Sequence, residues 1–142
     1  MLSLRSIFRP SRVVDAHCDV PCGIYDPAQA RIEAESVYNI IKKYNDSSDD
    51  VFRTRCIFIK EERAELAKHH ISVLWSDYFK PEHEQQFPDL LKVCWQAAKQ
   101  CSEVKHSMDL GAAQKLLDLI DQIDEMWKAT GGPQKTRLQQ AA

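Results

Sequence analysis

The chain has 142 residues, of which 44% are hydrophobic and 28% are charged, and its formal net charge is −2. This length and balance fit one globular domain and exclude a disordered chain. No run of about 20 apolar residues occurs, so we expect no membrane-spanning helix. The sequence also lacks a glycine-rich phosphate loop and a basic patch with interleaved aromatic residues, so we expect no nucleic-acid partner.

Residues 1–16 differ in kind from the rest of the chain. Arg5, Arg9 and Arg12 stand there against a single acid, Asp15, so the remainder is more negative than the whole. Apolar residues are scattered in this leader and a proline interrupts any helix, so a secretory signal is not expected. Five cysteines without such a signal favour a reducing compartment. We interpret residues 1–16 as a propeptide removed in the cytoplasm, with an organellar transit peptide as the alternative.

Residues 17–22, which we call the hook, carry one imidazole and two thiols, from His17, Cys18 and Cys22. Such donors suit nickel, copper, zinc or iron rather than calcium or magnesium. Pro21 and Gly23 favour bends that turn the chain back on itself. On spacing alone, a local disulfide, a zinc half-site and two ordinary thiols remain open. The donor types indicate a redox metal.

The first helix is predicted to be capped by Asp26, with Pro27 in its first turn. Its inward face recurs at helical spacing: Ala30, Glu33, Ala34, Val37, Ile40, Ile41 and Tyr44. Residues 45–50 form a polar linker, and a long second helix runs from there to about Tyr78. The predicted inward face of this helix is Phe52, Cys56, Ile59, Arg63, Leu66, His70 and Val73.

Two charged residues interrupt these apolar faces with opposite signs, Glu33 in the first and Arg63 in the second. Charged side chains are rarely buried unless they are paired. The pattern therefore predicts an inward Glu33–Arg63 pair. The alternative is that each side chain extends to solvent along its aliphatic stem.

Two further helices complete the pattern, after a connection bracketed by two prolines. The third carries Leu90, Leu91, Cys94, Ala97, Cys101 and Val104, and the fourth, capped by Asp109, carries Ala113, Leu116, Leu117, Ile120, Ile123 and Trp127. Gly131, Gly132 and Pro133 end the fourth helix, and the polar tail at 131–142 is expected to be mobile. We predict an all-α protein: an up-down antiparallel four-helix bundle over residues 17–130, with an N-terminal metal-binding hook.

A resemblance to a known family gives these elements a purpose. Residues 17–25, His-Cys-Asp-Val-Pro-Cys-Gly-Ile-Tyr, closely resemble the nickel hook of nickel-dependent superoxide dismutases. The resemblance continues through residues 26–36 and resumes in residues 59–70 and 73–81. It covers the chain from His17 to about Trp127, more loosely in the second half.

The resemblance implies one nickel ion per subunit, held by the amine and imidazole of His17, the backbone nitrogen and thiolate of Cys18, and the thiolate of Cys22. A free amine exists only after the Ala16–His17 bond is cut, because an amide nitrogen delocalises its lone pair into the carbonyl. A processing peptidase is therefore an expected partner, and uncut protein is expected to be inactive. Asp19, between the ligands, can hold the turn by accepting backbone hydrogen bonds.

The implied activity converts superoxide to dioxygen and hydrogen peroxide by cycling between Ni(II) and Ni(III). Thiolate and amide donors bring that couple into a useful range, and the His17 imidazole binds in the oxidised state and leaves on reduction. The family covers each hook by assembling six bundles, so a homohexamer is implied. Exposed thiolates are otherwise open to oxidation.

Five other residues take roles from the resemblance. Tyr25 lies near the open face of the metal and gates access to it, with Tyr78 close by. Glu33 and Arg63 orient the hook histidine, as metal-bound histidines require. Lys80 steadies the hook or attracts the anionic substrate. The remaining three cysteines, at positions 56, 94 and 101, are assigned only to packing.

Two other classes of function compete with this interpretation. In a thiol redox sensor or a zinc-binding helical bundle, Cys18 and Cys22 form a reversible disulfide or a structural metal site, and the Ala16–His17 bond stays intact. A purely structural bundle would use its amphipathic helices to bind partners. That last reading leaves the hook, the inward charges and the leader without a purpose.

Overall fold

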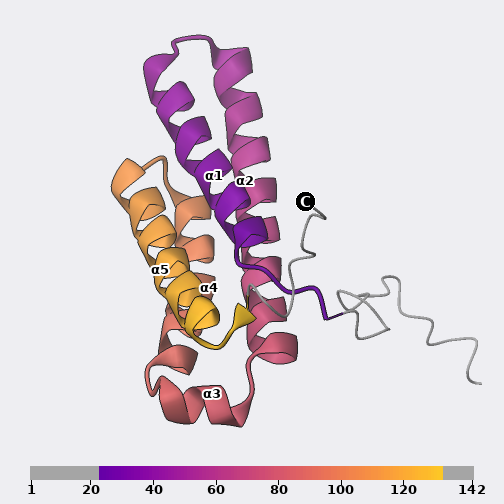
Figure 1. Ribbon diagram of the computed structural model, residues 1–142. Coiled ribbons are helices and arrows are strands. Elements are labelled where there is room, and N and C mark those ends of the chain that lie inside the picture. The colour runs from indigo at the N-terminus through magenta and orange to yellow at the C-terminus, as the bar shows by residue number, and fades with distance from the viewer. Residues whose placement is uncertain (1–22, 133–142) are drawn as a thin grey trace, which may run out of the picture.

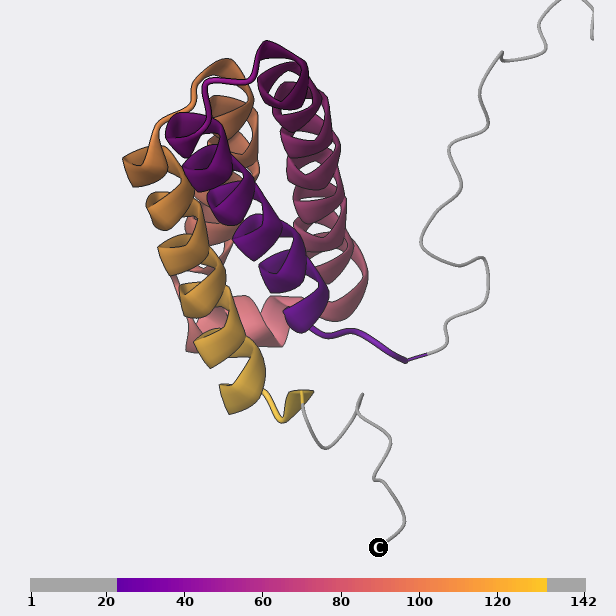
Figure 2. The same ribbon diagram turned by 90° about the horizontal axis from the view of Figure 1, so that it is seen from above.

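The computed structural model describes residues 23–132. These residues form α1 (Ala28–Asp46), α2 (Asp50–Val73), the π-helical turn η2 (Leu74–Tyr78), α3 (Pro81–Gln86), α4 (Leu90–His106) and α5 (Leu110–Ala129), with no strand among them. The long helices α1, α2, α4 and α5 pack in a ring, each against the next, with α5 closing on α1 (Figures 1 and 2). The predicted antiparallel four-helix bundle is confirmed. None of the helices in this part of the chain is long and apolar enough to cross a membrane.

Aspartate side chains mark the starts of three of the long helices. Asp26 accepts a hydrogen bond from the backbone N–H of Ala28 at 2.9 Å, so the predicted cap is present. Asp109 likewise accepts from two N–H groups in the first turn of α5. Asp49 does the same for α2, which narrows the predicted polar linker to residues 47–49. Each carboxylate satisfies donors that the first helical turn leaves without an intrahelical partner.

The core lies along the axis of the bundle and matches the predicted faces of α1, α4 and α5. Trp127 and Ile123 of α5 are almost completely buried, as are Val37 and Ile41 of α1. In α4 the prediction fails only at Leu91, which is 40% exposed. Val93 takes the buried position instead, because the buried stripe of α4 is rotated slightly from the one predicted.

The predicted face of α2 is right at Cys56 and Val73 but wrong at the positions between them. Its buried residues are Cys56, Lys60, Ala64, Ala67, Ile71 and Val73, and the stripe continues to Leu74 in η2. Phe52 and Ile59, both predicted to be inward, are each 41% exposed. Ala64 and Ala67 of α2 are fully buried in the same core cluster as Ala30 and Ala34 of α1, and small side chains let packed helices approach closely. Alanines thus occupy two positions of the buried face, whereas Phe52 and Ile59 stay partly exposed.

Lys60 is buried, although the apolar pattern of the sequence did not predict it to be. It is only 2% exposed, and its Nζ donates hydrogen bonds to the carbonyls of Lys105 and Ser107, both at 2.9 Å. These carbonyls lie at the end of α4, where the last turn has no intrahelical donors. Burial lowers the pKa of Lys60. The ammonium therefore joins α2 to the C-terminus of α4.

The second helix also ends differently from the prediction. Regular α-helix stops at Val73, and the turn η2 carries the chain on to Tyr78. The connection beyond it contains the short helix α3, which begins at Pro81, where a missing N–H costs nothing. His83 strengthens that start, because its Nδ1 accepts a hydrogen bond from the backbone N–H of Lys80 at 3.2 Å. A helix of six residues is too short to leave a periodic pattern in the sequence.

Candidate metal centre

The predicted ligands His17, Cys18 and Cys22 lie outside the described residues, as does Asp19. The described chain begins at Gly23, the residue directly after Cys22. Gly23 has φ +74°, a left-handed conformation that residues with a side chain rarely adopt. The backbone directly after the second cysteine therefore takes a conformation that favours glycine. It leads within a few residues to the first turn of α1.

Tyr25 lies against Tyr78, as predicted. Their ring centroids are 6.1 Å apart with the planes tilted by 52°, within the range of favourable aromatic pairs. Tyr78 is 7% exposed, whereas Tyr25 is half-buried. Figures 1 and 2 both show the start of the described chain beside the end of α5, at the α3 end of the bundle. The chain emerging from the hook is thus anchored on the bundle by an aromatic contact.

Glu33 and Arg63 form the predicted ion pair between α1 and α2. Nη1 of Arg63 lies 3.2 Å from Oε2 of Glu33, and the side chains are 32% and 16% exposed. Nη2 of Arg63 donates a second hydrogen bond, at 3.0 Å, to Glu62. Arg63 lies at the edge of the buried face of α2 rather than inside it, because that face is rotated from the predicted one. The pair is present; its role toward His17 stays a prediction.

Lys80 occupies the position before α3, two residues beyond Tyr78. Its side chain is exposed. An exposed ammonium two residues from Tyr78 in the sequence suits the predicted attraction of an anion, since local positive charge raises encounter rates. That role also stays a prediction.

Three of the five cysteines are excluded as ligands by their surroundings. Cys56, Cys94 and Cys101 are free thiols buried within the bundle. Burial raises the pKa of Cys94 and of Cys101 to about 12, so both keep their protons at neutral pH and are poor metal donors. Among residues 23–132 no group of three or more histidine, cysteine or acidic side chains is placed to hold a metal ion. The other thiols of the chain are Cys18 and Cys22.

The structure adds residues around Tyr78 that the sequence analysis missed. His83 stacks on the Tyr78 ring at 5.7 Å between centroids, and Trp127 approaches it at 6.5 Å. The Tyr78 hydroxyl forms a 2.8 Å hydrogen bond with Thr130. Thr130 is 52 residues away in the sequence, just past the end of α5. In the sequence, only Gly131 and Gly132 set this region apart. They predicted that the helix ends here, but not that Thr130 contacts Tyr78.

Comparisons with known proteins agree with this arrangement. The family model for nickel-containing superoxide dismutase matches residues 12–131. The chain is 53% identical, over 127 residues, to the proteins named superoxide dismutase [Ni] from Streptomyces coelicolor and Streptomyces seoulensis, covering 89% of this chain and 97% of each relative. The solved structure of native nickel superoxide dismutase superposes with a TM-score of 0.79 at 54% identity, covering 81% of this chain and 99% of that one.

Proposed function

This chain belongs to the nickel-containing superoxide dismutase family, and we propose that His17, Cys18 and Cys22 build its nickel centre. The activity is the conversion of superoxide to dioxygen and hydrogen peroxide. The main support for this ligand assignment is that other thiols of the chain are buried and protonated. Cys94 and Cys101 are held as protonated thiols inside the core, whereas Cys22 directly precedes Gly23, the left-handed residue at which the described chain begins.

The donor set fits nickel rather than a structural zinc ion. Two thiolates and nitrogen donors within six residues suit the planar coordination of divalent nickel. When bound, nickel supplies the one-electron redox change that dismutation needs. The thiolates of Cys18 and Cys22 and the backbone nitrogen of Cys18 would hold the ion as anionic donors and would favour its higher oxidation state. The amine and imidazole of His17 would supply its neutral nitrogen donors.

The proposed nickel site can form only after residues 1–16 are removed. We propose that residues 1–16 are removed, because only a cut Ala16–His17 bond gives His17 a basic amine. The working domain is then residues 17–130, with residues beyond 130 as a tail. A processing peptidase is the partner that this maturation requires.

The flanking residues take their proposed roles from where they lie. The Tyr25–Tyr78 contact, at 6.1 Å between rings, supports a gate beside the metal that controls access to it. The Glu33–Arg63 pair, at 3.2 Å, supports a rigid partner for the His17 imidazole. Lys80 offers local positive charge to an anionic substrate.

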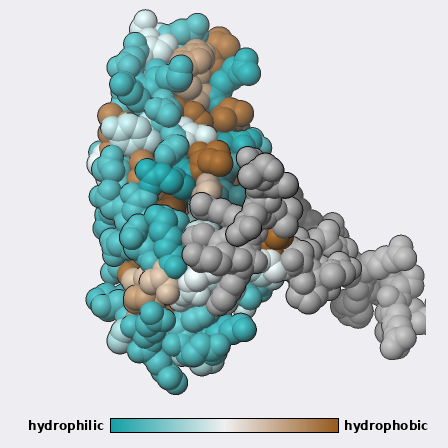
Figure 3. All heavy atoms as spheres, in the orientation of Figure 1, coloured by the Kyte–Doolittle hydropathy of each residue, from teal (hydrophilic) through white to brown (hydrophobic). Residues whose placement is uncertain are grey.

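Two exposed apolar surfaces support the proposed homohexamer. The first lies on the half of α2 that projects beyond α4 and α5, and it consists of Val51, Phe52, Ile57, Phe58 and Ile59. Phe58 is 69% exposed. Figure 3 shows apolar side chains among hydrophilic ones at this projecting end. Several large apolar side chains exposed on one end of a helix are typical of an interface.

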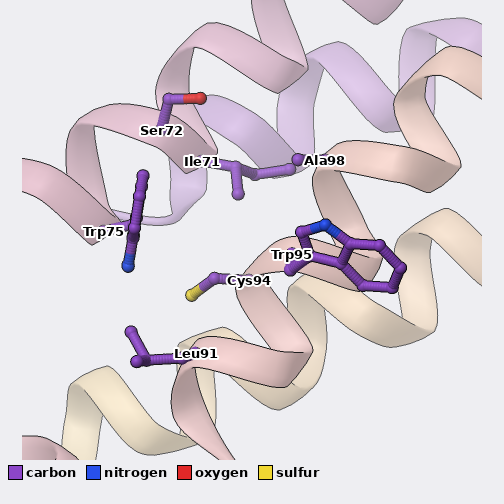
Figure 4. A pocket seen from close by; sticks show the side chains of 7 residues that line it. All are labelled: Ile71, Ser72, Trp75, Leu91, Cys94, Trp95 and Ala98. Atoms are coloured by element: carbon purple, nitrogen blue, oxygen red, sulfur yellow. The ribbon is translucent and has the colours of Figure 1, made fainter.

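The second apolar surface is a groove of about 290 Å³ between α4 and the end of α2. Trp75 and Trp95 flank it, with Leu91 beside them and the Cys94 sulfur at its floor (Figure 4). The two tryptophans are 53% and 62% exposed. Burying both surfaces against other copies of the chain would remove this area from water.

We place the protein in the cytoplasm. Cys56, Cys94 and Cys101 are free thiols in the structure, which fits a reducing compartment.

Intact mass and metal analysis of the purified active protein test the central proposal. We expect chains that begin at His17, with one nickel ion each. Active protein that keeps residues 1–16, or that works equally well without nickel, would contradict it. Zinc bound to uncut chains would favour the zinc-binding bundle instead.

A further inference from the structure

The ring of Tyr78 is held by aromatic neighbours from three segments of the chain. Phe79 meets it edge-on at 5.1 Å, and His83 of α3 stacks on it at 5.7 Å with the planes 23° apart. Trp127 of α5 contacts it at 6.5 Å. These contacts limit where the ring can lie, but none of them fixes the rotation of its hydroxyl group.

The hydroxyl is fixed by Thr130, and the hydrogen bonds show which group donates. Oγ1 of Thr130 donates to the carbonyl of Trp127 at 2.8 Å, because a carbonyl can only accept. A threonine hydroxyl has a single proton. The 2.8 Å contact between Tyr78 and Thr130 must therefore use the phenolic proton, with Tyr78 as the donor.

The backbone at the end of α5 holds Thr130 in place. Its N–H donates to the carbonyl of Met126 at 3.1 Å. Gly131 comes next with φ +79°, and Gly132 lies so close to the Trp127 indole that a Cβ on it would come within 2.2 Å of the ring. The position of the Thr130 hydroxyl is thus determined by the helix terminus rather than by a flexible loop.

We propose that Thr130 is a positioning residue for the dismutase reaction. Its hydroxyl oxygen accepts the hydrogen bond that the phenolic O–H of Tyr78 donates, and so fixes that ring and its hydroxyl opposite Tyr25, where the chain leaves the hook. The inference rests on the proposed function, because it needs Tyr25 and Tyr78 to lie beside the metal. It gives the glycine-marked end of α5 a part in the site, which the sequence analysis read only as a helix stop.

A double-mutant cycle tests the proposal, using Tyr78→Phe, Thr130→Val and the variant with both changes, each in the mature nickel-loaded protein that begins at His17. Two properties are measured: kcat/KM for superoxide, and the urea midpoint of unfolding. We expect Tyr78→Phe and Thr130→Val each to lower kcat/KM by about fivefold, roughly the factor for one neutral hydrogen bond. The double variant should be no worse than either single one, in both measurements, because a shared interaction can be lost only once.

Two further variants separate positioning from structure. Thr130→Ser keeps the hydroxyl and should restore most of kcat/KM. Thr54→Val removes a matched threonine hydroxyl, one that bonds a backbone carbonyl at 2.8 Å on the exposed face of α2, and should leave kcat/KM unchanged.

The outcomes distinguish this proposal from the proposed function. If the effect of Thr130→Val is as large in the Tyr78→Phe background as in the parent, Thr130 acts on the helix end alone and the inference is wrong. An unchanged kcat/KM in Thr130→Val overturns it as well. A parent protein without nickel or activity would instead refute the proposed function, while the unfolding midpoints would still report whether the two hydroxyls are coupled.

Discussion

The hook and the bundle differ in how far apart in the sequence their interacting residues lie. In the bundle, the buried side chains come from all four long helices, and the Tyr78 hydroxyl is held by a residue 52 positions away in the sequence. In the hook, all three predicted ligand residues fall within six consecutive residues. The local segment carries the chemistry, whereas the dispersed contacts carry the fold. Substitutions in the hook should therefore remove activity without unfolding the protein, whereas substitutions in the bundle core should lower its stability.

The largest effect is expected from the hook. Cys18→Ser and Cys22→Ser should each abolish dismutation and nickel binding, because each removes a thiolate that the higher oxidation state needs. The helices should persist, since their core lies within residues 23–132. Activity, nickel content and far-ultraviolet circular dichroism, measured on the same samples, check this.

A matched cysteine change in the bundle serves as the control. Cys56→Ser should keep nickel and activity, because Cys56 is a buried thiol remote from the hook in sequence. Loss of helix in the hook variants would break the proposed division between the regions. So would full activity in either one.

The next largest effect is expected where the two regions meet. Glu33→Gln should lower kcat/KM by about tenfold to a hundredfold, the usual result of removing a group that orients a metal-bound histidine. The stability change should stay below about 1 kcal/mol, because the pair is partly exposed. Stopped-flow kinetics and urea unfolding measure the two quantities.

Glu35 offers a control on the same helix. It pairs with Arg31 at 2.9 Å, but both side chains are largely exposed. Glu35→Gln should therefore leave kcat/KM near that of the parent. Equal losses in the two variants would show that the charge of α1, rather than the Glu33–Arg63 pair, matters to the site.

A smaller effect is expected on the outer face of the bundle. Phe58→Glu should shift the protein from the proposed hexamer towards smaller species, because it places a charge in the apolar surface of α2. Phe58→Leu should preserve the assembly. Native mass spectrometry counts the subunits, and an unchanged hexamer in the glutamate variant would remove this surface from the interface.

The last prediction concerns how the buried thiol of Cys101 changes the free energy of unfolding at alkaline pH. Burial raises the pKa of Cys101 from 9.0 to about 12, so the folded chain keeps a proton that the unfolded chain loses. This contribution is fully present below about pH 9 and is lost as the pH rises towards 12. It lowers the free energy of unfolding by about 1.4 kcal/mol per pH unit in that range.

Cys101→Ala should reduce that slope by the same amount when urea unfolding is compared between about pH 9 and 10.5. Lys60 contributes with the opposite sign, because its pKa is lowered, but it is common to both proteins and cancels in the difference. Ser102→Ala, the next residue of α4, removes no titrating group and should keep the slope of the parent. Equal slopes in all three proteins would contradict the prediction.

Much of the fold was predictable because helix signals are local. The caps at Asp26 and Asp109 need only neighbouring backbone N–H groups, and the apolar spacing of α1 and α5 reports their buried faces directly. The hook was predictable for the same reason, since its donors are adjacent in the sequence. Its geometry lies outside the described residues, so its ligand set stays a prediction.

The orientation of α2 was decided by tertiary packing. Hydrophobicity favoured the stripe through Phe52 and Ile59, but close helix packing favoured the alanines and left those large side chains partly exposed. Lys60 could enter the core only because α4 ends where its ammonium can reach two carbonyls. The residues near Lys60 in the sequence do not show that α4 ends within reach of its ammonium.

The amino-acid sequence alone thus determined the helices, their caps and the cluster of metal donors, because each depends on residues that are neighbours along the chain. Tertiary structure decided which face of α2 is buried and which hydroxyl meets Tyr78. Those outcomes depend on side-chain volume and on where distant helices end. Such quantities exist only once the bundle has assembled.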